Sequence, residues 1–253
     1  MPDAIARLDW SRRNELRAVI LQHPVVHLQR PDLDEAGLLE FAASLGTPEP
    51  SPRANFQIEG YPQIIRMGNL RDQHGDRIAG SAVSFGWHTD NSYRPHPPEL
   101  TLLYAIDVPS RGGDTQFVSF YDIHESLDDE TVALWETYDV EHVTRSGYIA
   151  GALDEHRAIH PLIRRHPESG RPLVYASPGY ARRVCGLDDA MSARVLARVS
   201  EIIEPLQTSH RWEPADLIVW DNRAAAHRAT SHDPSETRLL WRVLVSTSPV
   251  AAA

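Results

Sequence analysis

Two histidines and an aspartate set the strongest constraint on how this chain can fold. His88 and Asp90 stand two residues apart, and His227 follows 137 residues after Asp90. Residues i and i+2 of an extended segment point to the same side, so His88 and Asp90 can converge on one ion. His227 has to reach that ion from a distant segment. The fold must therefore bring a second strand, remote in sequence, alongside this motif.

These three side chains form a donor set with a defined chemistry. Two neutral imidazoles and one carboxylate suit iron better than the thiolates of many structural zinc sites, and they leave one face of the ion open. A non-haem Fe(II) oxygenase binds its cosubstrate and O₂ at such a face. Because the chain has 13 histidines, an isolated His-x-Asp match is weak, and the prediction depends on the surrounding residues.

The composition is that of an ordinary globular protein. A length of 253 residues, with 42% hydrophobic and 24% charged residues, fits a single domain spanning 1–253. The net charge of −10 argues against nucleic acid as a partner. No segment is long and apolar enough for a membrane span, and the N-terminus lacks a signal-peptide pattern. We expect a cytoplasmic protein without a nucleic-acid or membrane partner.

The basic residues narrow the chemistry further. All 25 are arginine, so Schiff-base enzymes, pyridoxal-phosphate enzymes and Walker-type phosphate loops, which need lysine, are excluded. Any fixed anchor for a carboxylate must be arginine, whose planar fork pairs with a carboxylate in a bidentate manner. Cys185 is the only cysteine, which excludes an internal disulfide and a multi-cysteine metal site.

Hydrophobic periodicity predicts helices and strands that do not alternate regularly. Many short strands with a few long helices favour a mainly β fold, a sandwich or jelly roll with flanking helices, over a parallel α/β sheet. The polar, glycine-containing segment Gly68–Phe85 is predicted to be a mobile loop. The expected helices are Asp9–Leu21, Asp34–Leu45, Tyr121–Tyr138 and Asp189–Gln207. The expected strands are Val25–Leu28, Gln63–Met67, Leu100–Ile106, Thr115–Ser119, Val140–Ser146, Ile159–Arg164, Pro172–Ala176, Asp216–Trp220 and Leu239–Val245.

Two arginines downstream of His227 are the next informative feature. Arg238 follows His227 by 11 residues and Arg242 by 15, and on a strand both share a face with Leu240. Two arginines on the inner side of a strand are costly without anions to meet them. The strand around Leu240 is therefore expected to face an anionic ligand.

The ordered set of motifs resembles the taurine and dichlorophenoxyacetate dioxygenase family, from about Asp9 to Pro249. The resemblance implies a double-stranded β-helix (jelly roll) core. It also implies Fe(II), 2-oxoglutarate and O₂, with release of succinate and CO₂ as a small substrate is hydroxylated, desaturated or cleaved. The motifs that carry it are Phe85-Gly86-Trp87-His88-Thr89-Asp90, Pro97-Pro98, Gly112-Gly113-Asp114-Thr115, His160-Pro161, Trp220-Asp221-Asn222-Arg223 with His227, and Arg238-x-x-x-Arg242.

The same resemblance assigns roles to individual residues. His88, Asp90 and His227 would be the iron ligands. Thr115 and Arg238 would hold the distal carboxylate of 2-oxoglutarate, an arrangement of charge-assisted partner and hydroxyl that suits a dianion. Arg242 matches a position that contacts the acidic group of taurine in the taurine enzyme, and it is also a candidate for binding the cosubstrate. Asp221 and Asn222 are expected to order the loop that carries His227, and His160 is expected to be structural.

The sequence constrains the chemical identity of the substrate less than that of the cosubstrate. Arg242 suggests a small, carboxylate-bearing molecule. A histidine and an asparagine that grip the sulfonate in the taurine enzyme have no convincing counterpart upstream of His88, which argues against taurine itself. Family analogy suggests a homo-oligomer. The candidate substrate contacts on segments expected to flank the iron are Ser84, Trp87, Asn91, Tyr93, Tyr148, Tyr180, Arg182 and Arg242.

Two other functions stay open from the sequence. One is a 2-His-1-carboxylate oxygenase that does not use 2-oxoglutarate, against which Arg238 and Thr115 speak. The other is a non-catalytic metal-binding or ligand-sensing domain on the same fold, since fold alone does not decide function. Halogenation is disfavoured, because in related halogenases a small residue replaces the carboxylate and Asp90 fills that place.

Overall fold

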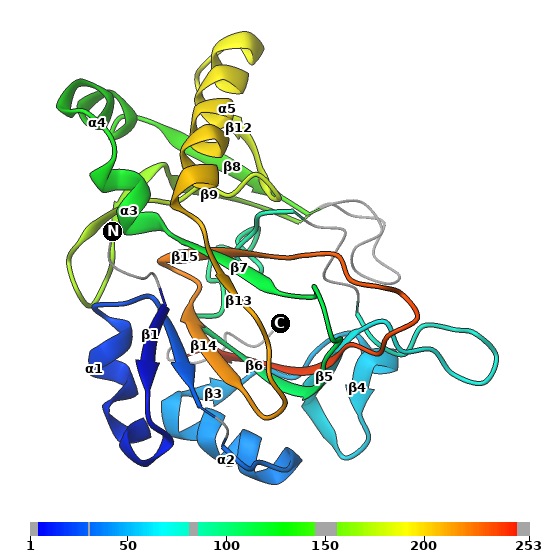
Figure 1. The fold of residues 1–253 in the computed structure, drawn as a ribbon. Coiled ribbons are helices and arrows are strands. Elements are labelled where there is room, and N and C mark those ends of the chain that lie inside the picture. Colours follow the sequence, from blue (N-terminus) through cyan, green and yellow to red (C-terminus); the bar gives the residue numbers. More distant parts are fainter. Residues whose placement is uncertain (1–4, 30, 81–85, 145–155, 247–253) are drawn as a thin grey trace.

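Two antiparallel sheets packed face to face form the centre of the molecule (Figure 1). The computed structural model describes residues 5–29, 31–80, 86–144 and 156–246. The larger sheet has the strand order β1-β2-β14-β6-β16-β5-β4, with β3 paired to β16, and the smaller sheet has the order β13-β7-β15. Only β1 and β2 pair in parallel within these two sheets. The mainly β fold with a jelly-roll core is confirmed.

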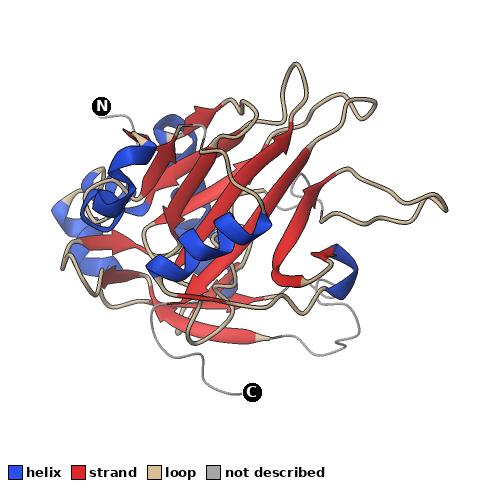
Figure 2. Cartoon of the chain, turned by 90° about the horizontal axis from the view of Figure 1, so that it is seen from below, coloured by secondary structure: helices blue, strands red, loops and turns tan. Residues whose placement is uncertain are grey.

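The helices cover the outer faces of the two sheets. In Figure 1, α1 and α2 lie against the larger sheet, and α3, α4 and α5 gather on the other side of the sandwich. Figure 2 shows the helices, in blue, around the red strands from below. The helices are α1 (Leu16–Ile20), α2 (Glu35–Leu45), α3 (Phe120–Glu125), α4 (Asp129–Trp135) and α5 (Asp189–Leu206), with 3₁₀ helices at Trp10–Glu15 and Ala54–Phe56.

The strands are short, and they occur in both halves of the chain. They are β1 (Ile5–Leu8), β2 (Val25–Leu28), β3 (Thr47–Pro48), β4 (Gln57–Ile58), β5 (Tyr61–Gly68), β6 (Leu100–Asp107), β7 (Thr115–Ser119), β8 (Asp139–Val143), β9 (Arg157–Pro161), β10 (Ile163–Arg165), β11 (Pro172–Val174), β12 (Ala181–Val184), β13 (Thr208–His210), β14 (Leu217–Asp221), β15 (Ala225–Ala229) and β16 (Leu239–Ser246).

Strand β14 shows why the layers form. All five of its residues are buried, because the strand lies between β2 and β6 and both of its faces are covered. Leu217 and Val219 point into the core shared with α1 and α2. Ile218 and Trp220 point the other way, into the core between the two sheets. This alternation follows from the two-residue period of a strand and fixes which residues can face the interior of the sandwich.

Two predicted helices differ from the structure. The segment Asp9–Leu21 begins as a 3₁₀ helix, because the Asp9 side chain accepts the Ser11 N–H in a tight turn, and only Leu16–Ile20 is α-helical. The segment Tyr121–Tyr138 is broken in two, because Asp128 caps a new helix by accepting the Thr131 N–H.

Several strands had no sequence signal or were misplaced. The unexpected strands are β1, β3, β4, β12, β13 and β15. β15 reads Ala-Ala-His-Arg-Ala, and alanine is depleted in strands. The single strand expected at Ile159–Arg164 is two strands, β9 and β10. Residues 145 and 146 of the expected strand at Val140–Ser146 lie outside the described residues.

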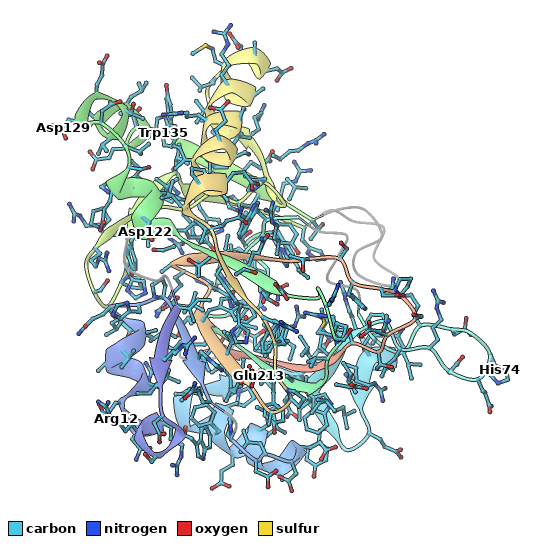
Figure 3. All side chains as sticks on the ribbon, viewed as in Figure 1. Arg12, His74, Asp122, Asp129, Trp135 and Glu213 are labelled. Carbon is cyan, nitrogen blue, oxygen red and sulfur yellow. The ribbon has the colours of Figure 1, made fainter. Side chains whose placement is uncertain are left out.

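The segment after β5 makes a long excursion from the sandwich. Its described part, residues 69–80, contains no helix or regular strand, and His74 marks its outer end in Figure 3. Residues 81–85 of the predicted loop lie outside the described residues. Among the helices of the described residues, none has the length and apolar character needed to cross a membrane.

Candidate metal centre

Backbone pairing brings His88 and His227 together. The His88 N–H donates to the His227 carbonyl at 2.9 Å, and the His227 N–H donates to the His88 carbonyl at 2.8 Å. Directly opposed residues of an antiparallel pair place their side chains on the same face, and the two imidazole centroids lie 4.2 Å apart. The distant strand required by the sequence is β15.

Asp90 lies in the turn that follows His88 and is the third member of the group. A nitrogen of each histidine and an oxygen of Asp90 all lie within 4.8 Å of one another, and all three residues are buried. His88 Nδ1 lies 2.9 Å from the Gly86 carbonyl, so with Nδ1 protonated the other ring nitrogen, Nε2, is available to a metal. Two imidazoles and a carboxylate at this spacing fit Fe(II).

Two side chains hold the Asp90 carboxylate. Thr101 Oγ1 on β6 donates to Oδ2 at 2.8 Å, and Arg242 Nη1 on β16 donates to Oδ1 at 3.1 Å. Asn222 Nδ2 donates to Thr101 Oγ1 at 2.7 Å, and Trp220 Nε1 donates to Asn222 Oδ1 at 2.8 Å. A buried hydrogen-bonded chain from β14 therefore fixes the orientation of the carboxylate.

The electrostatics keep the group in its metal-binding form. Burial acts to raise the pKa of Asp90, but Arg242, His227, His88 and the Thr101 hydroxyl outweigh it and lower the pKa to about 2. Burial, reinforced by the neighbouring His88, lowers the pKa of His227 to about 3. At neutral pH the aspartate is a carboxylate and His227 is neutral, which are the forms that coordinate a metal.

Arg238 and Thr115 are both buried near the start of β7. Arg238 is 2% exposed, its Nε donates to the Gly113 carbonyl at 2.9 Å, and burial lowers its pKa to about 10. Among the described residues it has no carboxylate within ion-pair distance. Thr115, also 2% exposed, accepts the Trp212 Nε1–H at 3.0 Å. A buried cation without a counter-ion is costly, so this position is suited to an anion.

The two glycines before Asp114 allow this close approach. A Cβ on Gly112 would lie 2.4 Å from the Ser231 carbonyl oxygen, and a Cβ on Gly113 would lie 2.8 Å from Pro109 Cγ and 3.2 Å from Arg238 Cδ. Both glycines have a φ of +69°, a conformation that residues with a Cβ rarely adopt. The glycine pair therefore leaves space for the Arg238 side chain beside the start of β7.

A pocket of about 460 Å³ opens beside Asp90 and contains Arg242 in its wall. Of the predicted substrate residues, Asn91 and Tyr93 also line it, together with Arg94 and His156. Three of the residues that line it are arginines, and Glu49 is the one acid among the described residues of its wall. Arginines therefore outnumber acids among the described residues of the pocket wall.

The lining of this pocket does not include Trp87, Tyr180 or Arg182, the other described residues among the predicted substrate contacts. The Trp87 indole packs into the core beside α5, and its Nε1–H lies 3.2 Å from Glu204. Tyr180 is 2% exposed, with its ring centroid 6.1 Å from that of His88. Arg182 is exposed on β12. Ser84 and Tyr148 lie outside the described residues.

The sequence did not single out Thr101. Thr101 lies inside an apolar strand, and threonine is a common residue in strands. Its role becomes visible only in the structure, where β6 lies beside Asp90. Asn222 was expected to order the loop before His227, and it contacts both Thr101 and the Thr89 hydroxyl. Asp221 instead pairs with Arg223 and His166, and His160 contacts the Ser92 carbonyl at 2.8 Å.

Comparison with known proteins gives consistent matches over nearly the whole chain. The family model described as "Taurine catabolism dioxygenase TauD, TfdA family" matches residues 2–244. Pentalenolactone F synthase of Streptomyces avermitilis is 30% identical, covering 96% of this chain and 88% of that protein. The (S)-phenoxypropionate/alpha-ketoglutarate-dioxygenase of Sphingobium herbicidovorans is 26% identical, covering 98% and 90%. The crystal structure of a taurine dioxygenase from Burkholderia xenovorans superimposes with a TM-score of 0.80 at 26% identity, covering 97% and 84%.

Proposed function

The chain belongs to the TauD/TfdA family of Fe(II)- and 2-oxoglutarate-dependent dioxygenases, and from this premise we propose that it oxidises a small anionic substrate held beside Asp90 by Arg242. Fe(II) and 2-oxoglutarate, when bound, activate O₂ for hydroxylation, desaturation or oxidative cleavage of the substrate, and succinate and CO₂ are released. The protein contributes the positions and charges around that chemistry.

The buried charge of Arg238, which has no carboxylate within ion-pair distance in the described part of the chain, is the observation that carries the cosubstrate assignment. We assign the distal carboxylate of 2-oxoglutarate to Arg238 and the Thr115 hydroxyl, both of which are buried near the start of β7. His88, Asp90 and His227 are assigned as the iron ligands. This assignment gives Arg238 an anionic partner, whereas an oxygenase that does not use 2-oxoglutarate would leave Arg238 without a counter-ion among the described residues.

The anionic substrate is inferred from the pocket wall. Arg53, Arg94 and Arg242 line the pocket with one acid among its described residues, Glu49. Arg94 pairs with Glu49 at 2.7 Å, and Arg242 pairs with Asp90 at 3.1 Å. The wall therefore carries an excess of positive charge, which favours a carboxylate or a sulfonate. Relatives with phenoxypropionate, 2,4-dichlorophenoxyacetate and sulfate esters in their names support this class of substrate.

The test is a screen of small acids followed by a variant at Arg242. Substrate-dependent succinate formation is measured with phenoxyacetates, 2-phenoxypropionate, taurine and sulfate esters, each beside its uncharged amide or alcohol analogue. For the best acid, Arg242→Ala is expected to raise the substrate KM at least tenfold, a loss of about 1.4 kcal/mol or more, and to raise the 2-oxoglutarate KM far less. Arg94→Gln, which changes a charge already paired with Glu49, is the matched control.

Two results would contradict the proposal. An unchanged substrate KM in Arg242→Ala would remove the substrate-binding role from that residue. Oxidation of a substrate without release of ¹⁴CO₂ from labelled 2-oxoglutarate would contradict the roles of Arg238 and Thr115. Anaerobic titration with Fe(II) and then 2-oxoglutarate checks both variants beforehand, because the visible charge-transfer band of the chelate reports an intact metal site.

Further expectations concern the whole chain. We infer that residues 1–253 form one domain, because the interior core takes residues from both sheets. A homo-oligomer and a cytoplasmic location are also proposed. Sedimentation equilibrium tests the first of these two, and fractionation of the source cells tests the second.

A further inference from the structure

A second group of metal-ligand side chains lies away from the iron site, at the rim of the sandwich. His27 comes from β2 in the larger sheet, His210 from β13 at the edge of the smaller sheet, and Asp216 immediately precedes β14. One nitrogen of each histidine and one oxygen of Asp216 lie within 4.8 Å of one another. The donor set, two imidazoles and a carboxylate, is the same as that of the iron site.

The strands explain why the two histidines face each other. His27 follows Val25 by two residues, and Val25 lies in the core between the sheets, so His27 points to the same inner side. His210 is paired with Thr115 across the β13–β7 ladder and shares its inward face. The two imidazole centroids are 4.7 Å apart. The group thus joins β2 of the larger sheet to β13, an edge strand of the smaller sheet.

Hydrogen bonding alone does not satisfy these side chains. His27 Nε2 lies 2.9 Å from Asp216 Oδ1, and His210 Nε2 lies 3.2 Å from Oδ2. Within the described part of the chain, however, neither buried nitrogen has a hydrogen-bond partner of acceptable direction. An imidazole N–H or lone pair lies in the ring plane, so each carboxylate oxygen is near its nitrogen but away from the line of a good hydrogen bond.

The group is buried, yet one side is accessible. His27 is 7% exposed, His210 9% and Asp216 3%, and all three line a pocket of about 540 Å³. Glu213, labelled in Figure 3, lies in the loop between β13 and β14, and its N–H donates to Asp216 Oδ2 at 2.9 Å. This bond fixes the orientation of the carboxylate, as a supporting contact does at a metal site, while the pocket supplies a path for an ion and for water.

We propose that His27, His210 and Asp216 form a second site for a divalent transition-metal ion of the zinc type, whose remaining position faces the pocket. Two imidazole nitrogens favour Zn²⁺, Co²⁺, Ni²⁺ or Cu²⁺ over Mg²⁺ and Ca²⁺, which prefer oxygen ligands. An ion there bridges β2, β13 and the start of β14. Its role is to hold the two sheet edges together.

The experiment counts bound metal in variants that separate the two sites. The apo protein is dialysed against Zn²⁺ and analysed by mass spectrometry for zinc per chain. The wild type is expected to bind two equivalents, His210→Gln and His88→Gln one each, and the double variant none. His210→Gln should retain the Fe(II)–2-oxoglutarate chelate band, which shows that its iron site is intact.

A different set of zinc counts would overturn the proposal. One equivalent in the wild type, kept in His210→Gln and lost in His88→Gln, would show that the group is a hydrogen-bonded link between the sheets and no metal site. Asp216→Asn gives a second variant of nearly the same shape, expected to lose the same equivalent. If these variants do not fold, anomalous diffraction from zinc-soaked wild-type crystals decides, with a peak between His27 and His210 expected and its absence overturning the proposal.

Discussion

At the scale of single residues, the carboxylate of Asp90 combines two requirements. It must stay ionised in a buried position to bind a metal, and it must keep one orientation. Arg242 chiefly serves the first requirement, because its guanidinium is the main cause that lowers the pKa of Asp90 against the effect of burial. Thr101 serves the second through a 2.8 Å hydrogen bond from a rigid strand.

Thr101→Val is expected to weaken Fe(II) binding by about ten- to a hundredfold, the usual cost of losing a partner of a metal ligand. Valine has the same shape but cannot donate to Asp90 or accept from Asn222. The Fe(II) dissociation constant is measured anaerobically by competition with a chelator. Thr101→Ser keeps the hydroxyl and serves as the control. Equal affinity in the valine and wild-type proteins would show that Arg242 alone orients the carboxylate.

Gly113→Ala is expected to raise the 2-oxoglutarate KM by an order of magnitude or more, because the added methyl group would meet Arg238 Cδ at 3.2 Å and would require a left-handed backbone. The arginine would have to shift from the carboxylate it is assigned to bind. The control is Gly170→Ala, at the same φ of +69° but with nothing within 4 Å of the new Cβ. A 2-oxoglutarate KM in Gly113→Ala no higher than that in Gly170→Ala would contradict the role assigned to Arg238.

The sequence predicts which residues form the metal site. It does not predict the neighbouring residues that hold the metal ligands in position. The spacing of His88 and Asp90 carries information because strand geometry is local. The contact from Thr101 to Asp90 depends on which strand lies next to the motif, and a threonine in β6 has no local feature that reveals it. The cluster of His27, His210 and Asp216 escaped prediction for the same reason, since its members come from three elements.

At the scale of elements, apolar strands and the long helix α5 were predictable, whereas short edge strands were not. The stripe of Val195, Val199 and Ile203 on α5 is buried, as the helical period predicts. β15, which carries His227, has alanine at three of its five positions and gains its strand conformation from pairing with β7. The element most important for the metal site thus had the weakest local signal.

The β12-β8-β9 sheet contains a buried histidine that couples folding to pH. His142 on β8 is fully buried, and its Nδ1 lies 2.9 Å from Ser92 Oγ. Burial, with smaller contributions from His160 and Arg164, lowers its pKa from 6.5 to about 3. Below pH 6.5 the unfolded chain binds a proton at this position that the folded chain does not. Stability therefore falls as the pH drops from about 6.5 towards about 3.

His142→Phe is expected to remove this dependence, which is at most about 1.4 kcal/mol per pH unit. At pH 7 the variant should be less stable by about 1 kcal/mol through loss of the hydrogen bond to Ser92, and the two stability curves should cross about one pH unit below 6.5. Urea unfolding at pH 7, 6 and 5 gives the curves. Parallel curves over this range would mean that His142 takes up a proton in the folded protein as readily as in the unfolded chain.

At the scale of the whole molecule, the iron site lies where separate parts of the fold meet. His227 belongs to the smaller sheet, Arg242 belongs to the larger sheet, and His88 and Asp90 come from the segment that pairs with β15. Such an arrangement is absent from the unfolded chain. Binding of Fe(II) and 2-oxoglutarate is therefore coupled to the association of the two sheets.

Loading with Fe(II) and 2-oxoglutarate under anaerobic conditions should consequently raise the melting temperature. A ligand at a hundred times its dissociation constant stabilises the folded state by about 2.7 kcal/mol, which corresponds to about 5 to 10 °C for a chain of this size. Calorimetry of apo, Fe(II)-loaded and fully loaded protein separates the two steps. Arg238→Met should keep the increase due to Fe(II) and lose the one due to 2-oxoglutarate, while His227→Gln should lose both. If His227→Gln keeps the full increase, the stabilising metal is bound elsewhere, and the rim group of His27, His210 and Asp216 is the position at which to look for it.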